Sequence, residues 1–464
     1  MIRMKRGAGS RKKVIIVGAG PGGLMAAREL AEYADVTIIE KGKDISKRTC
    51  QVLKGKDCIY CNVCNVTAGI GGAGGMSDGK LNLNPLIGGD LIDFLGMGRT
   101  QDLFDMVDAY FVEHGAPDEA PHVPSAGLEQ SAAANGIEFI PIKQKHIGSD
   151  MLPKVIGSMK KDLENRGVKF MLNTTVESLT ARNKKATGVI ANGNQLLADF
   201  VLLAPGRSGS TWLGEQMKKY DVPIKYMPID VGVRVEVPAV VYDEAVKTNW
   251  DPKFRMRTPT YDDLVRTFCT CPYGFVVQDT YESGVGANGH SQRNCRSNNT
   301  NFAFLSKIAL TEPLENTNEY GSTIAEQAKT IGGGKPLLQR LGDLKKGRRS
   351  TWERLKRSYV EPTLRFVTPG DISMALPHRV VTDLIEGLDM LDRVVPGVAS
   401  DATLLYAPEI KFAAVRPETR DHFETAVIDN LYVCGDGAGV TRGIVPAAAM
   451  GIECAEGIIE KIEK

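Results

Sequence analysis

Three spaced glycines give the first sign of chemistry in this chain. Gly18, Gly20 and Gly23 match the pattern G-x-G-x-x-G, and they follow a short apolar run at residues 14–17. In this pattern the first glycine permits a tight turn, the second lets the backbone approach a pyrophosphate, and the third lets the next helix pack closely. The N–H groups at the start of that helix favour a bound anion. We therefore predict a strand, a phosphate-binding turn and a helix over residues 14–31.

A second strand is predicted at residues 36–39, and Glu40 follows it about 20 positions after the glycines. A carboxylate at this point can accept hydrogen bonds from both hydroxyls of a ribose. The alternative interpretation is a glycine-rich turn without a ligand. The motif predicts a dinucleotide and does not by itself separate FAD from NAD.

Four cysteines form the second candidate site. Cys50, Cys58, Cys61 and Cys64 make the pattern C-x7-C-x2-C-x2-C. Two residues between thiolates allow a short loop to direct its sulfurs at one metal ion or cluster. Three interpretations stay open: an iron–sulfur cluster (4Fe–4S) or a zinc site, a redox-active cysteine pair, and plain reduced thiols.

The next segment, residues 69–79, holds six glycines in eleven positions, so we expect no regular element there. Such a loop lets the backbone approach a flat cofactor or an anion, and its alternative is a flexible surface loop. A redox reaction on an organic molecule also needs a proton donor or acceptor. Lys80, His146 and Glu409 are the candidates, although His146 could equally be a satisfied structural histidine.

Two further segments resemble motifs of glutathione-reductase-type flavoproteins. A short apolar run at residues 431–433 leads into Gly435 and Asp436, and then into Gly443, Ile444 and an apolar helix. The resemblance implies that Asp436 contacts the ribityl-phosphate region of FAD and that the helix starts at the flavin. Residues 200–209 resemble the A-T-G motif of the same superfamily, with Pro205 in place of the usual Thr. The resemblance implies FAD and a backbone contact near Val176. The residues predicted to bind FAD are Gly18, Ala19, Gly20, Pro21, Gly22, Gly23, Glu40, Lys41, Arg48, Val176, Ala204, Gly206, Gly435, Asp436, Gly443 and Ile444.

A resemblance over nearly the whole chain is carried by several other segments. They are the cysteine array running into GGAGGMSDGKLNL, residues 146–150, residues 266–274, residues 369–371 and residues 407–412. Together they look like a family of largely uncharacterised FAD-dependent dehydrogenases. This resemblance implies the fold and the cofactor more than the reaction.

The expected fold is α/β, with a Rossmann-like FAD-binding domain and an inserted α+β substrate domain. The first domain combines a parallel sheet with a three-stranded β-meander that turns at Asn192-Gly193-Asn194. The second is built on an antiparallel sheet, because residues 231–237 alternate and Cys269 and Cys271 lie in a similar run that residues 275–277 continue. Helices are predicted at residues 101–114 and 151–166, the latter capped by Ser149-Asp150.

The predicted boundaries divide the chain into six segments. These are a flexible basic tail (1–13), the first part of the FAD-binding domain (14–85), a helical connection (86–145), the second part of the FAD-binding domain (146–215), the substrate domain (216–405) and the C-terminal part of the FAD-binding domain (406–464).

Composition and net charge limit the classes of binding partner and the cellular compartment that we expect. The 464 residues carry a net charge of +1, which predicts no general attraction to DNA or a membrane surface. No apolar run is long enough to span a membrane, and the basic start has no apolar core of a signal peptide. Nine cysteines, an odd number, favour a reducing compartment, so we expect a cytoplasmic protein.

The leading hypothesis is an FAD-dependent oxidoreductase that transfers a hydride or an electron pair between flavin and a small organic substrate. Reduction of a carbon–carbon double bond, or the reverse dehydrogenation, is the reaction we expect. No second strand, G-x-G-x-x-G and helix unit follows the first, so the electrons would come from an external, ferredoxin-like donor. Two alternatives are an electron-transfer flavoprotein with a cysteine-ligated cluster and a flavin-dependent RNA-modifying enzyme, which the net charge disfavours.

Overall fold

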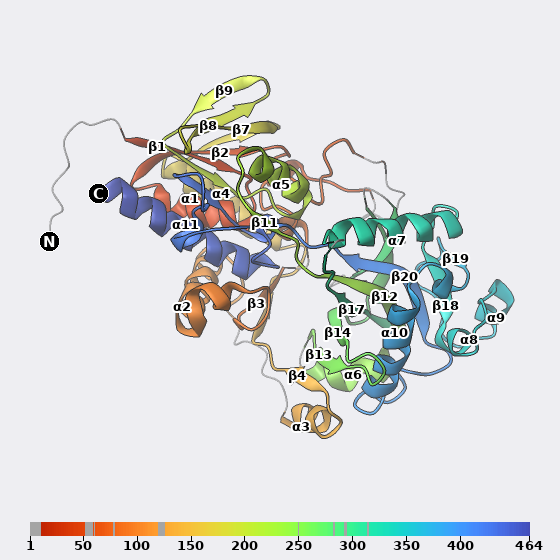
Figure 1. The fold of residues 1–464 in the computed structure, drawn as a ribbon. Coiled ribbons are helices and arrows are strands. Elements are labelled where there is room, and N and C mark those ends of the chain that lie inside the picture. Colours follow the sequence, from red (N-terminus) through yellow and green to blue (C-terminus); the bar gives the residue numbers. More distant parts are fainter. Residues whose placement is uncertain are drawn as a thin grey trace. The chain divides into compact units, whose positions relative to one another are not determined.

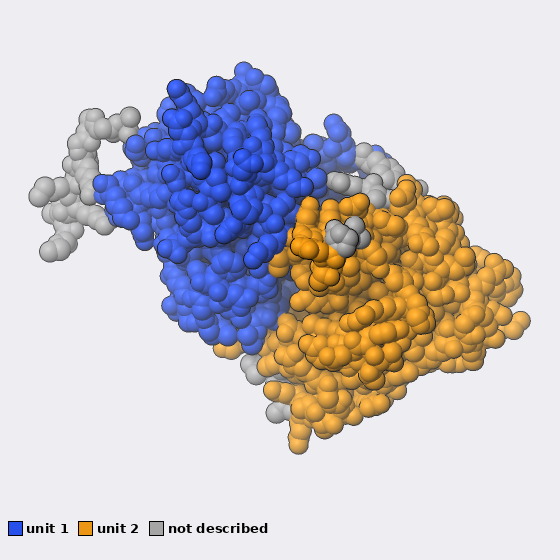
Figure 2. Space-filling view, in the orientation of Figure 1, with its two compact units in different colours: residues 1–118, 146–225, 414–464 blue, residues 119–145, 226–413 orange. Residues whose placement is uncertain are grey.

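The computed structural model describes residues 11–51, 59, 61–77, 79–118, 126–248, 250–281, 284–291, 295–312 and 315–464. The chain forms two compact units (Figure 2). Unit 1 comprises residues 1–118, 146–225 and 414–464, and unit 2 comprises residues 119–145 and 226–413. Each unit has a hydrophobic core of its own.

A five-stranded parallel sheet forms the centre of unit 1, with the strand order β22-β10-β1-β2-β6. Its strands are nearly continuous apolar runs, because parallel sheets are buried on both faces. The predicted Rossmann-like domain is confirmed. The strands are β1 (Lys12–Val17), β2 (Ala34–Glu40), β6 (Lys169–Leu172), β10 (Phe200–Leu203) and β22 (Leu431–Val433).

The predicted three-stranded meander is also present (Figure 1). It consists of β7 (Val176–Arg182), β8 (Lys185–Ala191) and β9 (Asn194–Leu197), all antiparallel. The turn between β8 and β9 contains Asn192 and Gly193, and both have positive φ angles, as a tight hairpin turn requires.

Five helices accompany the sheet and the meander in the described part of unit 1. They are α1 (Pro21–Leu30), α2 (Leu91–Glu113), α4 (Leu152–Asn165), α5 (Ser210–Lys219) and α11 (Ile444–Glu463). Short 3-10 turns lie at η1 (Ile45–Lys47), η3 (Gly74–Met76), η4 (Arg207–Gly209), η6 (Asp421–Phe423) and η7 (Asp436–Ala438). The short strands are β3 (Lys80–Asn82), β5 (Gln144–His146), β11 (Ile224–Lys225) and β21 (Arg416–Pro417).

The cap predicted for α4 is wrong. Met151 is the N-cap and makes no side-chain capping bond, so Ser149 and Asp150 do not fill that role. The carbonyl of Gly148 instead accepts a hydrogen bond from the N–H of Leu152 at 3.0 Å. The backbone therefore begins the helix without a polar side chain.

Unit 2 is built on an eight-stranded sheet with the order β19-β18-β20-β12-β17-β14-β13-β4. Every pair is antiparallel except β18 with β19, as predicted for the second domain. The strands are β4 (Glu138–Ile140), β12 (Ile229–Pro238), β13 (Lys253–Arg257), β14 (Leu264–Cys271), β17 (Asn299–Ile308), β18 (Leu337–Arg340), β19 (Thr368–Pro369) and β20 (Leu404–Lys411).

Helices pack against this sheet, among them α6, α7 and α10 (Figure 1). The described helices of unit 2 are α3 (Ala126–Ala134), α6 (Ala239–Thr248), α7 (Thr317–Ile331), α8 (Leu341–Lys345), α9 (Trp352–Lys356), the 3-10 turn η5 (Ile372–Met374) and α10 (His378–Leu391). None of the helices in the described part of the chain is both long and apolar enough to cross a membrane.

The structure also differs from the sequence expectation at two strands. The segment 86–145, expected to be a helical connection, also contributes β4 to the edge of the eight-stranded sheet. Residues 275–277 do not continue β14, because Pro272 has no N–H for the ladder and the chain turns there. They instead belong to β15 (Phe275–Thr280), which pairs with β16 (Val285–His290) in a separate two-stranded sheet.

Candidate FAD-binding site

The turn after β1 contains two glycines at positions where the protein's own packing leaves no room for a side chain. Gly18 has φ of +105°, and a Cβ atom there would lie 2.2 Å from the carbonyl oxygen of Ala204. A Cβ on Gly23 would lie 2.1 Å from the carbonyl oxygen of Gly18. Both positions therefore need glycine for the close contact of β1, α1 and β10.

Gly20 serves a different purpose, because neither its conformation nor its neighbours exclude a side chain. Its backbone is extended (φ −74°, ψ −179°), and the nearest atom to an added Cβ is the Cα of Gly72 at 3.9 Å. Gly20 is the N-cap of α1 and makes no side-chain capping bond. The space that a side chain would fill thus lies at a helix N-terminus, where N–H groups can bind a pyrophosphate.

The glycine-rich stretch packs directly on this turn and is not a detached surface loop. The N–H of Gly71 donates to the carbonyl of Ala19 at 2.8 Å, and a Cβ on Gly72 would lie 3.0 Å from the Cα of Gly20. A Cβ on Gly74 would lie 2.9 Å from the side chain of Ile444. Backbone from residues 71–74 therefore forms one wall of the site.

The two motifs that resemble those of glutathione-reductase-type flavoproteins, at residues 200–209 and 431–444, lie at the same edge of the parallel sheet. A Cβ on Gly437 would lie 2.6 Å from the carbonyl oxygen of Gly206, so the turns after β10 and β22 touch. The Asp436 carboxylate accepts hydrogen bonds from Thr441 Oγ1 (2.9 Å) and from the N–H of Gly443 (3.1 Å), which precedes α11. Burial raises the pKa of Asp436, and Arg207 opposes this shift. The motifs that are separate in the sequence thus form one cradle.

Glu40 braces this cradle through three backbone donors. Its carboxylate accepts hydrogen bonds from the N–H groups of Ala19 (2.9 Å), Gly42 (2.8 Å) and Gly69 (2.8 Å). The side chain therefore joins the glycine turn to the glycine-rich stretch. The ribose contact predicted for Glu40 stays a prediction, as do the contacts of its neighbour Lys41 and of Val176, the first residue of β7.

Arg48 binds backbone carbonyls of the chain itself, and its predicted contact with FAD stays a prediction. Its buried guanidinium donates to the carbonyls of Asn65 (2.9 Å), Val66 (2.8 Å) and Ile70 (2.6 Å). Burial lowers the pKa of Arg48 to about 10, and Glu40 and Cys64 oppose this shift. The side chain thus holds the segment that follows the cysteine array against the wall of the cradle.

The cysteine array is described in part. Cys50 is half-buried and Cys61 and Cys64 are exposed, whereas Cys58 lies outside the described residues. Within the part of the chain that the structure describes, these thiols are not gathered at metal-ligand spacing. The group that is gathered, with ligand atoms within 4.8 Å, is His422, Glu453 and Glu456, whose carboxylates already bind Arg99. The metal prediction stays a prediction.

Two of the three catalytic candidates lie on neighbouring segments of unit 1. The N–H of Ile147 donates to the carbonyl of Gly79 at 3.1 Å, so the backbone at Lys80 and His146 runs side by side. Both side chains are half-buried.

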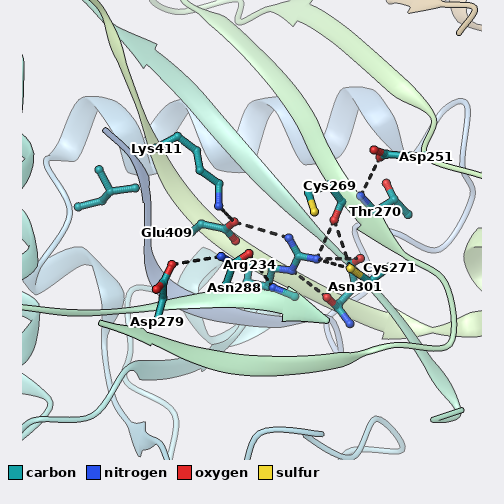
Figure 3. Close-up of polar contacts among 12 residues, drawn as sticks. Arg234, Asp251, Cys269, Thr270, Cys271, Asp279, Asn288, Asn301, Glu409 and Lys411 are labelled. Atoms are coloured by element: carbon teal, nitrogen blue, oxygen red, sulfur yellow. Dashed lines mark hydrogen bonds and ion pairs between the residues drawn. The ribbon is translucent and has the colours of Figure 1, made fainter. Parts of the chain in front are cut away.

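Glu409 belongs to unit 2 and is fully buried between two cations (Figure 3). Its carboxylate lies 2.6 Å from Lys411 Nζ and 3.6 Å from Arg234 Nη1. Burial raises the pKa of Glu409, and the two cations oppose this shift. Sequence reasoning missed Arg234, although a charged residue among the apolar residues of 231–237 was a visible signal.

Family comparisons match three parts of the chain. The family described as FAD binding domain matches residues 11–51, and the family described as pyridine nucleotide-disulphide oxidoreductase matches residues 127–241. The family described as FAD-dependent protein, C-terminal domain-like, matches residues 228–411. All three matches point to FAD-dependent oxidoreductases, and the predicted resemblance to that class is confirmed. The predicted cofactor FAD and the predicted enzyme class are confirmed.

Individual proteins show a wider likeness. An uncharacterised protein of Clostridium beijerinckii is 29% identical over 481 residues, which cover 98% of this chain and 82% of that protein. The crystal structure of L-proline dehydrogenase from P. horikoshii has a TM-score of 0.43 and 11% identity, and the match covers 97% of this chain and 94% of that one. Glycine oxidase from Bacillus cereus has a TM-score of 0.42 and 12% identity, with coverage of 98% and 96%.

Proposed function

We propose that this FAD-dependent oxidoreductase transfers a hydride or an electron pair between FAD and a small organic substrate. Reduction of a carbon–carbon double bond, or the reverse dehydrogenation, is the proposed reaction, and an external donor supplies the electrons. The observation that carries the proposal is the open space at Gly20. The protein's own packing does not require a glycine there, so we explain the space by a bound ligand. FAD supplies the redox chemistry when it is bound.

The chain's own residues would hold and orient the cofactor and move the proton. The N-terminus of α1 suits the pyrophosphate, and Asp436 fixes the turn that leads into α11. Lys80 and His146, on adjacent segments, are the proposed proton donors. Glu409 is a weaker candidate, because it is fully buried and bound by two cations.

The test is an anaerobic reoxidation experiment on purified, FAD-loaded protein. The flavin is reduced with light and then mixed with unsaturated acids and enones while its absorbance near the oxidised band is followed. We expect reoxidation by at least one of these compounds, at least tenfold slower in His146→Ala or Lys80→Gln and unchanged in Lys143→Gln, an exposed control. Reoxidation only by a one-electron acceptor protein, or only with RNA present, would contradict the proposal and favour one of the two alternatives.

We also propose that the cysteine array binds an iron–sulfur cluster that accepts electrons from a ferredoxin-like donor. The support is its connection to the cradle: Arg48 binds the carbonyls of Asn65 and Ile70, and the N–H of Ala68 donates to the carbonyl of Cys64 at 3.0 Å. The cysteine loop is therefore continuous with the wall beside Gly20.

Metal analysis tests this part separately. Anaerobically purified protein should contain iron and acid-labile sulfide and should show a broad visible absorbance beneath the flavin bands. Cys61→Ala should lose the iron and sulfide and keep FAD, and Cys295→Ala, an exposed cysteine elsewhere, should keep both. A wild-type protein with flavin bands and no iron would overturn the cluster, and zinc in its place would identify the alternative metal.

A further inference from the structure

A buried charged cluster in unit 2 contains Glu409, the weakest of the proton-donor candidates, and its other members have no part in the proposed FAD chemistry. We name it the Arg234 cluster; its members are Arg234, Cys269, Cys271, Asn301, Glu409 and Lys411 (Figure 3). The side chain of Arg234 is fully buried on β12. Its Nε donates to Asn301 Oδ1 at 2.8 Å, and its Nη2 donates to the carbonyl of Cys269 at 2.7 Å and to Cys271 Sγ at 3.2 Å.

The charges within the Arg234 cluster do not balance. Arg234 and Lys411 are cations, and Glu409 is the carboxylate that both of them contact. A buried charge without a counter-charge is strongly unfavourable. Asn301 Nδ2 is also buried and has no acceptor among the described residues. A second anion is therefore expected beside Arg234.

The other described acidic groups on the surrounding elements already have partners. Glu236, also on β12, accepts hydrogen bonds from Thr363 and Tyr406. Asp251 contacts Lys253 at 2.6 Å and accepts the N–H of Thr270 at 2.8 Å. Asp230 contacts Arg266 at 2.7 Å.

Asp279, on β15, accepts a hydrogen bond from Asn288 on β16 at 3.1 Å (Figure 3). Among the residues that the structure describes, this leaves the sulfur of Cys271, which already accepts an Arg234 N–H, as the group that can supply the second anion. Guanidinium contacts of this kind favour a thiolate over a thiol.

The backbone of β14 is irregular at the two cysteines. In an extended strand, residues two apart are separated by about 6.7 Å, which is the upper limit for a disulfide. Here β14 has a bulge between Phe268 and Cys271, and Cys269 has φ of +49°. Cys271 Sγ lies 3.6 Å from the carbonyl oxygen of Cys269, so the side chain of Cys271 is directed back toward that residue. Cys269 is half-buried and Cys271 is buried, so Cys269 is the one that a reagent reaches.

We propose that Cys269 and Cys271 form a redox-active pair that exchanges with small-molecule disulfides, with Arg234 holding Cys271 as the thiolate. Cys269 loses its proton and attacks the disulfide R–S–S–R, which breaks the S–S bond, forms Cys269–S–S–R and releases R–S⁻. The Cys271 thiolate then attacks Cys269 Sγ, forms the Cys269–Cys271 bond and releases the second R–S⁻. The cysteine pair loses two electrons, the small disulfide gains them, and the proton from Cys269 ends on one released thiolate.

The first test uses the full-length protein in glutathione redox buffers of increasing oxidised fraction, trapped with N-ethylmaleimide and digested with trypsin. The peptide 267–293 contains Cys269 and Cys271 and no other cysteine. We expect it to change from two maleimide groups to none, with the loss of two hydrogen masses and without bound glutathione. A wild-type peptide that keeps two maleimides at every ratio, or stops at a glutathione adduct, overturns the proposal.

Two variants sharpen this test. Cys271→Ser should stop at a glutathione adduct on Cys269, because the resolving thiolate is gone, whereas Cys295→Ser, which removes an exposed cysteine, should behave as wild type. The wild-type result does not depend on either variant folding.

A second measurement addresses the charge directly. Near pH 7 the wild-type protein should absorb more at 240 nm than Cys271→Ser, by the amount of a single thiolate, and acidification should remove the difference. Equal absorbance of the two folded proteins would overturn the role of Arg234.

Discussion

At the scale of single residues, buried carboxylates are held by donors from distant parts of the chain. Glu40 accepts three backbone N–H groups from three separate segments. Glu236 accepts hydrogen bonds from Thr363 and Tyr406 inside unit 2. Burial of such a carboxylate costs desolvation free energy, which its several hydrogen bonds offset. Replacing the carboxylate should therefore change the stability of the protein measurably.

Glu40→Gln should weaken the cradle. The amide group would present an N–H donor to at least one backbone N–H, which leaves a buried donor unsatisfied and costs about 1–3 kcal/mol. We expect a lower unfolding midpoint and weaker FAD binding, measured by thermal unfolding and by FAD titration. Glu32→Gln, an exposed control, should stay within about 0.5 kcal/mol. If Glu40→Gln equals the wild type in stability and in FAD affinity, the three hydrogen bonds of Glu40 are unimportant for the cradle.

The buried carboxyl group of Glu236 should make the stability of the protein depend on pH. Burial raises its pKa, with Thr363 and Tyr406 opposing, so the folded protein holds this proton to a higher pH than the unfolded chain does. As pH rises above the unfolded value of about 4.3, wild type should therefore lose stability relative to Glu236→Gln, by about 1.4 kcal/mol per unit of pKa difference. Denaturant unfolding of both proteins from pH 4 to pH 7 measures this. If the stability of the wild type relative to Glu236→Gln stays constant or increases as the pH rises, the prediction is wrong.

The sequence identified the cradle residues but not every role. The three motif glycines and Asp436 were found because their local pattern is tied to one backbone geometry. Arg48 was expected at the ligand, yet its donors are used by loop carbonyls 17 to 22 positions away. Arg234 and Glu409 are 175 residues apart and meet because β12 pairs with β20. Local sequence patterns do not reveal contacts between residues that are so far apart along the chain.

At the scale of elements, the close contact of α1 and α11 positions both helix starts. A Cβ on Gly451 would lie 2.1 Å from the carbonyl oxygen of Gly22, so the two helices touch through backbone. Sequence reasoning predicted both helices, since each has a motif before it and an apolar run. It did not predict that β4 joins the far edge of the second sheet, because strand pairing over more than 100 residues has no local signal.

Gly451→Ala should push these helices apart. Overpacking of this kind costs about 1–3 kcal/mol, and the displaced α11 should also bind FAD less tightly. Gly98→Ala, in α2, has nothing within 4 Å and should be neutral or stabilising by up to about 1 kcal/mol. Thermal unfolding and FAD content measure both variants. A Gly451→Ala protein as stable as Gly98→Ala would contradict the packing described.

At the scale of the whole molecule, the two units have separate cores and only unit 1 carries the cradle. A ligand that binds the folded state stabilises it by about 2.7 kcal/mol at 100 times its Kd. Calorimetry with increasing FAD should therefore raise the midpoint of one transition and leave a second, assigned to unit 2, within a degree or so. If both transitions move equally, the units unfold together.

The measurement that tests the account most directly is the FAD content of purified Gly20→Val beside wild type and Gly98→Ala. The Cβ of the valine would meet the Cα of Gly72 at 3.9 Å, the extended backbone suits valine, and its methyl groups would fill the space in front of α1. The account predicts a folded Gly20→Val protein with wild-type stability in the absence of FAD and almost no bound flavin, whereas Gly98→Ala keeps its flavin. A Gly20→Val protein that retains wild-type FAD would contradict the placement of the cofactor in this cradle.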